Sequence, residues 1–121
     1  MERSVEDIKY IEPLNRYSQA VIYSGVAYLA GQVAADPGTD FRDQTGQVLT
    51  QIDTLLEKCG SDKTRLLTVA IFLKDLRDLP TFNTLWDAWI VPNRLPTRLP
   101  IEANLASQEY LVEIQVNAAI K

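Results

Sequence analysis

Short apolar runs separated by turn-forming residues predict strands in the first third of the chain. Residues 17–23 and 26–33 are rich in β-branched and aromatic side chains, and the two-residue link Ser24-Gly25 between them is typical of a β-hairpin. A weaker strand is expected at residues 8–12, where the run ends at a proline. This part of the chain therefore predicts three strands, of which the second and third form a hairpin.

Two later segments carry apolar residues at the period of a helix. In residues 41–59 these positions share one face, Asp40 lies at the N-terminal end and Gly60 follows as a stop signal. A second helix is expected from Asp78, with a proline in its first turn, and it ends before Pro92. We expect both apolar stripes to be buried, including the two tryptophans of the second helix.

The remaining apolar runs predict three more strands. Residues 66–74 are apolar on both faces of the pleat, residues 110–120 alternate, and residues 98–105 are mixed. The order strand, strand, strand, helix, strand, helix, strand, strand defines an α+β fold, a single domain over residues 1–121 with a mixed sheet and both helices on one face. The other face would expose apolar side chains in a monomer, so we expect a homo-oligomer.

An arginine in the next-to-last strand raises the first question of chemistry. We expect the last two strands to pair antiparallel around a turn at residues 106–108, with Leu99 aligned with Val112. This register places Arg98 opposite Glu113 on one face. The pair has a structural interpretation, an ion pair that holds strands or subunits together. It also has a functional one, because a guanidinium offers paired donors to a bound carboxylate and stays charged at any working pH.

Composition and charge disfavour several classes of function. The chain has 121 residues, 46% hydrophobic and 23% charged, as expected of one globular domain, and no apolar run is long enough to span a membrane. The N-terminal sequence lacks the apolar segment of a secretory signal, so a cytoplasmic protein is expected. A net charge of −4 argues against a nucleic-acid partner, because phosphate binding depends on clustered lysine and arginine.

Missing residue types restrict the chemistry further. The sequence contains no histidine, which excludes histidine metal sites, histidine-based nucleophile pairs and imidazole acid–base catalysis. The single cysteine, Cys59, lies on the apolar stripe of the first helix and is interpreted as core packing. Any catalysis must therefore use carboxylates, arginine, tyrosine, backbone groups and water, and no metal or cofactor is expected.

Four stretches of the sequence together resemble one known family. They are YSQAVIYSGVAYLAGQVAADP, FLKDLRDLPTFNTLWDAW, PTRLPIEANL and LVEIQVNAAI, and they occur in the expected order over nearly the whole chain. The chain thereby resembles the RidA (YjgF) family of small trimeric enamine/imine deaminases. The resemblance implies a fold similar to that of the small bacterial chorismate mutase, a homotrimer, and a pocket at each cleft between subunits.

The resemblance also implies roles for individual residues. Arg98 matches the arginine that binds the substrate carboxylate, and Glu113 matches the glutamate that holds or activates the attacking water. Tyr17 matches an aromatic residue lining the pocket, Gly31 a glycine where backbone comes close to ligand, and Asn83 a helix asparagine. Taken alone, these three residues would be interpreted as an interface tyrosine, a bulge and an ordinary polar helix position.

The activity that the resemblance implies is hydrolysis of 2-imino acids, or their enamine tautomers, to 2-keto acids and ammonia. The main-chain carbonyl of Pro100 is then a candidate acceptor for the departing nitrogen. The sequence departs from the family pattern at Asn15, Arg16, Ala30, Leu99 and Pro100, and these changes bear on the substrate more than on the fold. The alternative function is a non-catalytic trimer that binds or senses small carboxylates.

Overall fold

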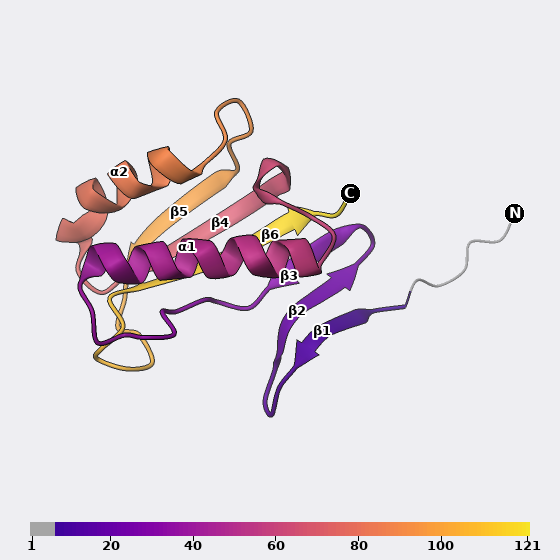
Figure 1. The fold of residues 1–121 in the computed structure, drawn as a ribbon, viewed down its shortest axis with the longest axis horizontal. Coiled ribbons are helices and arrows are strands. Elements are labelled where there is room, and N and C mark those ends of the chain that lie inside the picture. The colour runs from indigo at the N-terminus through magenta and orange to yellow at the C-terminus, as the bar shows by residue number, and fades with distance from the viewer. Residues whose placement is uncertain (1–6) are drawn as a thin grey trace, which may run out of the picture.

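The structure is a computed structural model that describes residues 7–121 (Figure 1). Strands and helices follow one another in the predicted order. The strands are β1 (Lys9–Pro13), β2 (Ser18–Tyr23), β3 (Val26–Leu29), β4 (Leu66–Leu73), β5 (Thr97–Glu102) and β6 (Val112–Ala119), and the α-helices are α1 (Phe41–Lys58) and α2 (Leu79–Trp89). Short 3₁₀ turns at Lys63–Arg65 and Leu76–Asp78 precede β4 and α2. Within residues 7–121, no helix combines the length and the apolar character needed to cross a bilayer.

The strands form one mixed sheet in the order β1-β2-β3-β6-β4-β5. All neighbours are antiparallel except β4 and β5, which run parallel and are connected through α2. The predicted hairpin is confirmed: Ser24 and Gly25 join β2 to β3 with φ angles of 50° and 80°, the left-handed conformation that a two-residue hairpin turn requires. Beyond Leu29 the chain leaves the regular ladder and meets β6 again in an isolated bridge at Gln32.

Both helices cover the same face of the sheet, as the sequence predicts (Figure 1). The first turn of α1 is capped by Asp40, whose side chain accepts a 2.8 Å hydrogen bond from the amide of Asp43. The apolar stripe of α1 packs on the inward side chains of β4 and β6. The largest fully buried side chains of this core include Ile52, Leu56, Ile71, Phe82 and Ile114.

The predicted core roles of the cysteine and the tryptophans are confirmed. Cys59 and Trp86 are each only 5% exposed, and burial raises the pKa of the Cys59 thiol. Trp89 packs against the core and stays partly exposed, and its indole Nε1 donates a 3.0 Å hydrogen bond to Asp53 on α1. These residues therefore join α1, α2 and the sheet into one packed unit.

One predicted pairing is wrong, because β5 does not pair with β6. β5 lies at the sheet edge beside β4, where Arg98 stands opposite Val69. β6 lies on the other side of β4, where Glu113 stands opposite Phe72. The cause is the helix between β4 and β5, since a crossover of this kind joins parallel strands.

The same registers place Arg98 and Glu113 on opposite faces of the sheet. Arg98 shares the helix-covered face with the buried Val69. Glu113 alternates with Val112 and Ile114, which are both fully buried against the helices, so its side chain lies on the uncovered face. The predicted direct pair between the arginine and the glutamate is therefore excluded within one chain.

The uncovered face carries apolar side chains that nothing in residues 7–121 shields. The strand registers place Tyr10 and Tyr28 in one row with Asn117, and Leu99 in a row with Gln115. The exposed fractions of the three apolar residues are 61%, 46% and 57%, respectively. A face of this kind is the feature from which self-association was predicted, and the oligomer remains a prediction.

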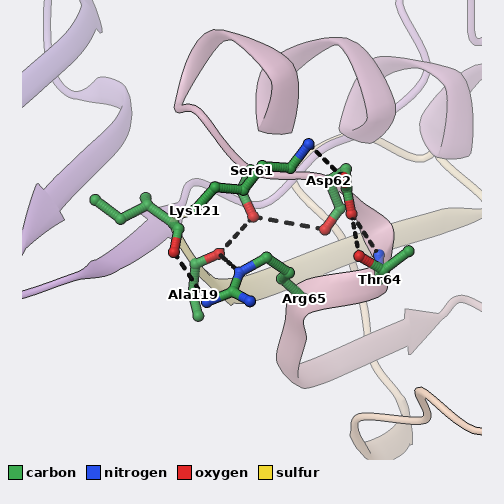
Figure 2. A network of polar contacts seen from close by, with 7 residues as sticks. Ser61, Asp62, Thr64, Arg65, Ala119 and Lys121 are labelled. Carbon is green, nitrogen blue, oxygen red and sulfur yellow. Dashed lines mark hydrogen bonds and ion pairs between the residues drawn. The ribbon is translucent and has the colours of Figure 1, made fainter.

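A network of polar contacts fixes the end of β6 (Figure 2). Ser61 Oγ donates a 2.6 Å hydrogen bond to the carbonyl of Ala119, and Arg65 Nε donates to the same oxygen at 3.2 Å. Lys121 Nζ lies 2.7 Å from Asp62 Oδ2, and its hydrogen bond lowers the pKa of the Asp62 carboxyl group. We call six residues the C-terminal network: Ser61, Asp62, Thr64, Arg65, Ala119 and Lys121.

Candidate functional site

Arg98 lies on the edge strand β5, and its guanidinium rests against the aromatic rings of α2. The distance from its Cζ to the ring centroid is 5.5 Å for Trp86 and 6.0 Å for Phe82, within the range of a cation–π contact. No carboxylate oxygen of residues 7–121 lies within 4.0 Å of its nitrogens. The charge is therefore held in place without being neutralised, which leaves its donors available to an anion.

Two further predicted residues lie on the elements that surround Arg98. Asn83 follows Phe82 on α2, and its side-chain Oδ1 is buried with no hydrogen-bond partner among the described residues. Pro100 stands two residues beyond Arg98 on β5, opposite Ile71, and has no amide hydrogen to donate. A buried oxygen without a partner is costly unless something donates to it, so Asn83 is a candidate acceptor for a ligand. We call Asn83, Arg98 and Pro100 the β5 half-site.

Glu113, near the start of β6, packs its carboxylate against the backbone of Gly31. A Cβ built on Gly31 would lie 2.1 Å from Glu113 Oε2, so the carboxylate occupies the space that any other residue would need. The approach is fixed by the next residue, Gln32, because its amide and carbonyl exchange hydrogen bonds of 2.8 and 3.1 Å with Ile114. The Gly31 backbone thus lies close to the carboxylate of Glu113, and its predicted approach to a ligand stays a prediction.

The electrostatic environment of Glu113 differs from that of an ordinary surface glutamate. No cationic nitrogen of residues 7–121 lies within 4.0 Å of its carboxylate. Burial raises the pKa of this carboxyl group, because the charged form loses part of its hydration. A carboxylate of raised pKa accepts a proton from water more readily than an ordinary one, so Glu113 is suited to general-base chemistry.

Tyr17 and Gly31 line a hollow of about 520 Å³ between α1 and the β1–β2 hairpin. Tyr17 is 55% exposed. Tyr110 lines this hollow as well. The alternating pattern predicted Tyr110 as part of the last strand, but that strand begins at Val112. We call Tyr17, Gly31 and Glu113 the β6 half-site.

The sequence reading missed a residue that holds Tyr110 in place. Gln44 of α1 is fully buried, its Nε2 donates to the carbonyl of Glu109 at 2.9 Å, and its Oε1 accepts from the amide of Leu111 at 3.0 Å. The same Nε2 donates to the carbonyl of Pro37 at 2.8 Å. Both neighbours of Tyr110 are thereby tied to α1. The only signal in the sequence is a polar residue on the otherwise apolar face of a helix.

The two half-sites do not meet within one chain. Arg98 lines a separate hollow of about 250 Å³ together with Leu99 and Gln115, whereas Tyr17 and Gly31 line the larger one. Strand β4 lies between the strands that carry the arginine and the glutamate. The structure thus keeps Arg98 apart from Glu113, and Gly31 joins the second set because it lines the hollow with Tyr17 and lies against the Glu113 carboxylate.

This arrangement defines a class of protein: a small α+β domain whose candidate site is divided between two parts of its surface. A family described as Endoribonuclease L-PSP matches residues 7–120. A RutC family protein from Haemophilus ducreyi (strain 35000HP) is 44% identical over 113 residues, which cover 93% of this chain and 97% of that protein.

Solved structures agree with this match. NMB1025 from Neisseria meningitidis, described as a member of the YjgF protein family, is 42% identical, covers 95% of this chain and 96% of its own, and superposes with a TM-score of 0.91. A protein from Salmonella typhimurium, described as a putative translation initiation inhibitor, is 39% identical over 93% of this chain and 97% of its own, with a TM-score of 0.85. The chain belongs to the L-PSP family, which is the RidA (YjgF) family predicted from the sequence motifs.

Proposed function

We propose that this protein hydrolyses 2-imino acids, or their enamine tautomers, to 2-keto acids and ammonia at sites between the subunits of a homotrimer. One observation carries the proposal: among residues 7–121, Arg98 has no carboxylate and Glu113 no cation within 4.0 Å. A substrate that carries a carboxylate next to an electrophilic C=N carbon satisfies both groups at once. Histidine, which the sequence lacks, is not needed for this reaction.

Arg98 binds the carboxylate of the substrate. Its planar guanidinium donates two parallel hydrogen bonds to the two carboxylate oxygens, and the ring of Trp86 behind it restricts its motion. Binding in this way fixes the neighbouring C=N carbon in the cleft. The positive charge also offsets the negative charge next to the reacting carbon.

Glu113 orients a water molecule and accepts its proton as the water oxygen attacks the C=N carbon. The nitrogen takes up the proton, which gives a tetrahedral carbinolamine. Glu113 then passes the proton of the hydroxyl group to the nitrogen, the C–N bond breaks, ammonia leaves, and the carbon becomes the carbonyl of the 2-keto acid. The unpartnered Oδ1 of Asn83 and the carbonyl of Pro100 are the proposed acceptors for the N–H groups of the departing nitrogen.

The site requires two chains because the sheet separates its halves. A β5 half-site from one subunit faces a β6 half-site from the next when copies associate head to tail, and three such contacts close a ring. The uncovered sheet face, with Tyr10, Tyr28 and Leu99 exposed, supplies apolar surface for this association. The tyrosine of the β6 half-site, Tyr17, is exposed enough to contact a ligand held by the neighbouring chain.

The activity is tested with imines made in place. An amino-acid oxidase or threonine dehydratase generates 2-iminopropanoate or 2-iminobutanoate, and semicarbazide traps the imine that remains. The protein is expected to lower the yield of semicarbazone in proportion to its concentration. Equal trapping with wild-type protein, with Arg98→Ala protein and with buffer alone would rule out the deaminase.

Assembly of the site from two chains is tested by mixing two inactive variants. Arg98→Ala and Glu113→Gln proteins are unfolded together and refolded as a 1:1 mixture. In a ring with random subunit order, about a quarter of the sites combine an intact arginine with an intact glutamate, so about a quarter of the wild-type activity returns. No recovery in mixed rings would show that both residues act from the same chain.

The second candidate function is a trimer that binds small carboxylates without turnover. It is favoured by the edge strand, where Leu99 is 57% exposed and Pro100 lacks an amide that a ligand could use. A 2-keto acid that binds wild-type protein but not Arg98→Ala protein, with no loss of imine, would select this function.

The family description also mentions RNA cleavage. A net charge of −4 makes a phosphate backbone an unfavourable ligand for this chain. Incubation with a labelled single-stranded RNA is the direct check, and intact RNA is the expected result.

A further inference from the structure

The hollow beside Gly31 is far larger than a small imino acid requires. Its volume of about 520 Å³ falls in the range of sites that enclose drug-sized ligands, roughly 300–1,000 Å³. Glu113 does not itself line the hollow, but Gly31 both lines it and lies against the Glu113 carboxylate, so the hollow and the group proposed to activate water adjoin at Gly31. A substrate held at the reacting position therefore has space for an extended side chain.

One wall of the hollow is a polar stripe on α1. Thr50, Thr54 and Lys58 lie at intervals of four residues, which places them on one line of the helix over about 12 Å. Lys58 Nζ lies 2.8 Å from Glu12 Oε2 of β1, so the far end of the stripe carries a neutralised ion pair. The wall offers hydroxyl groups and no net charge.

The opposite wall offers hydrogen-bond donors that the protein does not use. Gln19 accepts a 3.0 Å hydrogen bond from Gln32, which leaves the Gln19 amide nitrogen with no acceptor in residues 7–121. The side chains of Tyr17 and Tyr110 complete this wall with two phenol groups, and Gln44 fixes the neighbours of the second. A hollow with free donors and no net charge matches a ligand that is uncharged and rich in acceptors.

We infer that this hollow receives the substrate's side chain and selects imino acids whose side chains are extended, uncharged and hydrogen-bonding, such as a ureido or carboxamide chain. The inference rests on the proposed deamination and names its substrate class. Water adds to the C=N carbon and ammonia leaves as before. The side-chain carbonyl accepts hydrogen bonds from the Gln19 amide and the tyrosine hydroxyls, and its N–H groups donate to the threonine hydroxyl oxygens. Apolar and one-carbon side chains make no hydrogen bonds to these groups and displace the water that otherwise binds them.

The test compares imines generated from citrulline, norleucine and alanine with one amino-acid oxidase and semicarbazide trapping. Citrulline and norleucine give long side chains that differ in polarity, and alanine gives a short one. Relative to uncatalysed hydrolysis, the citrulline-derived imine is expected to be accelerated at least about tenfold more than the norleucine-derived imine, which equals about 1.4 kcal/mol.

A matched pair of variants tests whether the preference for the citrulline-derived imine arises in the hollow. Thr54 and Thr84 are both exposed helix residues whose Oγ1 donates to the carbonyl four residues earlier, Thr50 at 3.2 Å and Pro80 at 3.3 Å. Only Thr54 lines the hollow. Thr54→Val is expected to lower the citrulline-to-norleucine ratio about two- to tenfold, the effect of one hydrogen bond that Thr54 Oγ1 accepts from a ureido N–H. Thr84→Val is expected to leave the ratio unchanged.

Three outcomes separate this inference from the proposed function. If all three imines are accelerated equally and the two threonine variants behave alike, the hollow is not the side-chain site and the deaminase stands. If no imine is accelerated but the 2-keto acid of citrulline shifts the NMR signals of Thr50 and Thr54, the hollow binds the side chain and the deaminase fails. If neither acceleration nor binding occurs, both are overturned.

Discussion

The carboxylates at the two ends of strand β6 differ in whether a cation lies beside them. At its C-terminal end, Asp62 is paired with Lys121 at 2.7 Å and its pKa is lowered (Figure 2). At its N-terminal end, Glu113 has no cation within 4.0 Å in residues 7–121, and burial raises its pKa. A paired charge stabilises the fold, whereas a charge held without a partner costs stability and is available for chemistry. The comparison therefore contrasts a carboxylate that is paired at one end of β6 with a carboxylate at the other end that is unpaired within residues 7–121.

Replacing the unpaired carboxylate is expected to have the largest effect on activity. Glu113→Gln keeps the shape of the side chain but removes the proton acceptor, so kcat for imine hydrolysis falls about 10²- to 10⁴-fold. The same change removes a buried charge, so the melting temperature at neutral pH stays equal or rises. Activity and thermal melting are measured on the same preparation. An inactive variant with a strongly lowered melting temperature would mean that the glutamate is structural.

Adding one methyl group beside the carboxylate is expected to have the second-largest effect on activity. Gly31→Ala places a Cβ 2.1 Å from Glu113 Oε2, and the overlap pushes the flexible carboxylate away. The backbone accepts alanine without strain, because Gly31 does not have a left-handed φ. A displacement of about 1 Å from the reacting position lowers kcat about 10²-fold with little loss of stability. Gly46→Ala, at a helix position with open space around it, is the matched control and keeps full activity. Equal kcat values for the two variants would contradict the proposed role of Glu113.

Removing the unpaired cation is expected to weaken binding more than it slows the chemical step. Arg98→Ala loses charge-assisted hydrogen bonds to the substrate carboxylate, which raises KM about 10- to 100-fold. Arg98→Lys keeps the charge but not the paired donors, so its KM is expected to lie between those of wild-type and Arg98→Ala protein. The control is Arg77→Ala, because the Arg77 side chain is 90% exposed and its hydrogen bonds within residues 7–121 go to Asp75. An unchanged KM in Arg98→Ala protein would remove the arginine from the site.

The pH dependence should differ between the two ends of the strand. Activity requires the deprotonated form of Glu113, so kcat falls about tenfold per pH unit below its pKa, and the midpoint lies above the usual pKa of a glutamate. For stability the sign is opposite to that of a paired acid. A raised folded-state pKa makes the folded state bind more protons than the unfolded state, so this group lowers stability as pH rises through its pKa. A kcat profile with its midpoint at or below that of an ordinary glutamate would contradict the assignment.

Removing the ion pair between Asp62 and Lys121 is expected to lower stability without changing catalytic activity. The folded-state pKa of Asp62 is depressed, so its contribution to stability is present above its unfolded pKa and is lost as pH falls through the folded one. Asp62→Asn removes that contribution and lowers the melting temperature modestly at neutral pH, while kcat and KM for imine hydrolysis stay unchanged. A loss of activity without a change in melting would reverse the distinction between the two ends.

Most of the fold was predictable because local signals agreed with the final structure. The helix α1 begins and ends within a residue of the positions set by Asp40 and Gly60, and the Ser24-Gly25 hairpin forms as expected. The strand pairing of β5 was not predictable from alternation alone. Alignment of Leu99 with Val112 keeps apolar residues on one face, but it ignores the α2 crossover that makes β5 a parallel neighbour of β4.

The candidate site was predictable residue by residue but not as an arrangement. The motifs identified Arg98 and Glu113, yet their placement on opposite faces depends on strand order, which is a long-range property. Gln44 and Tyr110 were missed for a different reason. A buried amide that ties two loops to a helix has no periodic signal, and a tyrosine just before a strand continues the alternation of that strand.

The contact between Gly31 and Glu113 also constrains how these two positions can change during evolution. Because the carboxylate fills the volume in which a side chain at position 31 would lie, the two positions cannot vary independently. A lineage that replaces the glycine must shorten, displace or abandon the acid, and a lineage that has lost the acid is released from the glycine. A glycine at position 31 together with a glutamate at position 113 is therefore the pair that the proposed mechanism requires of a relative.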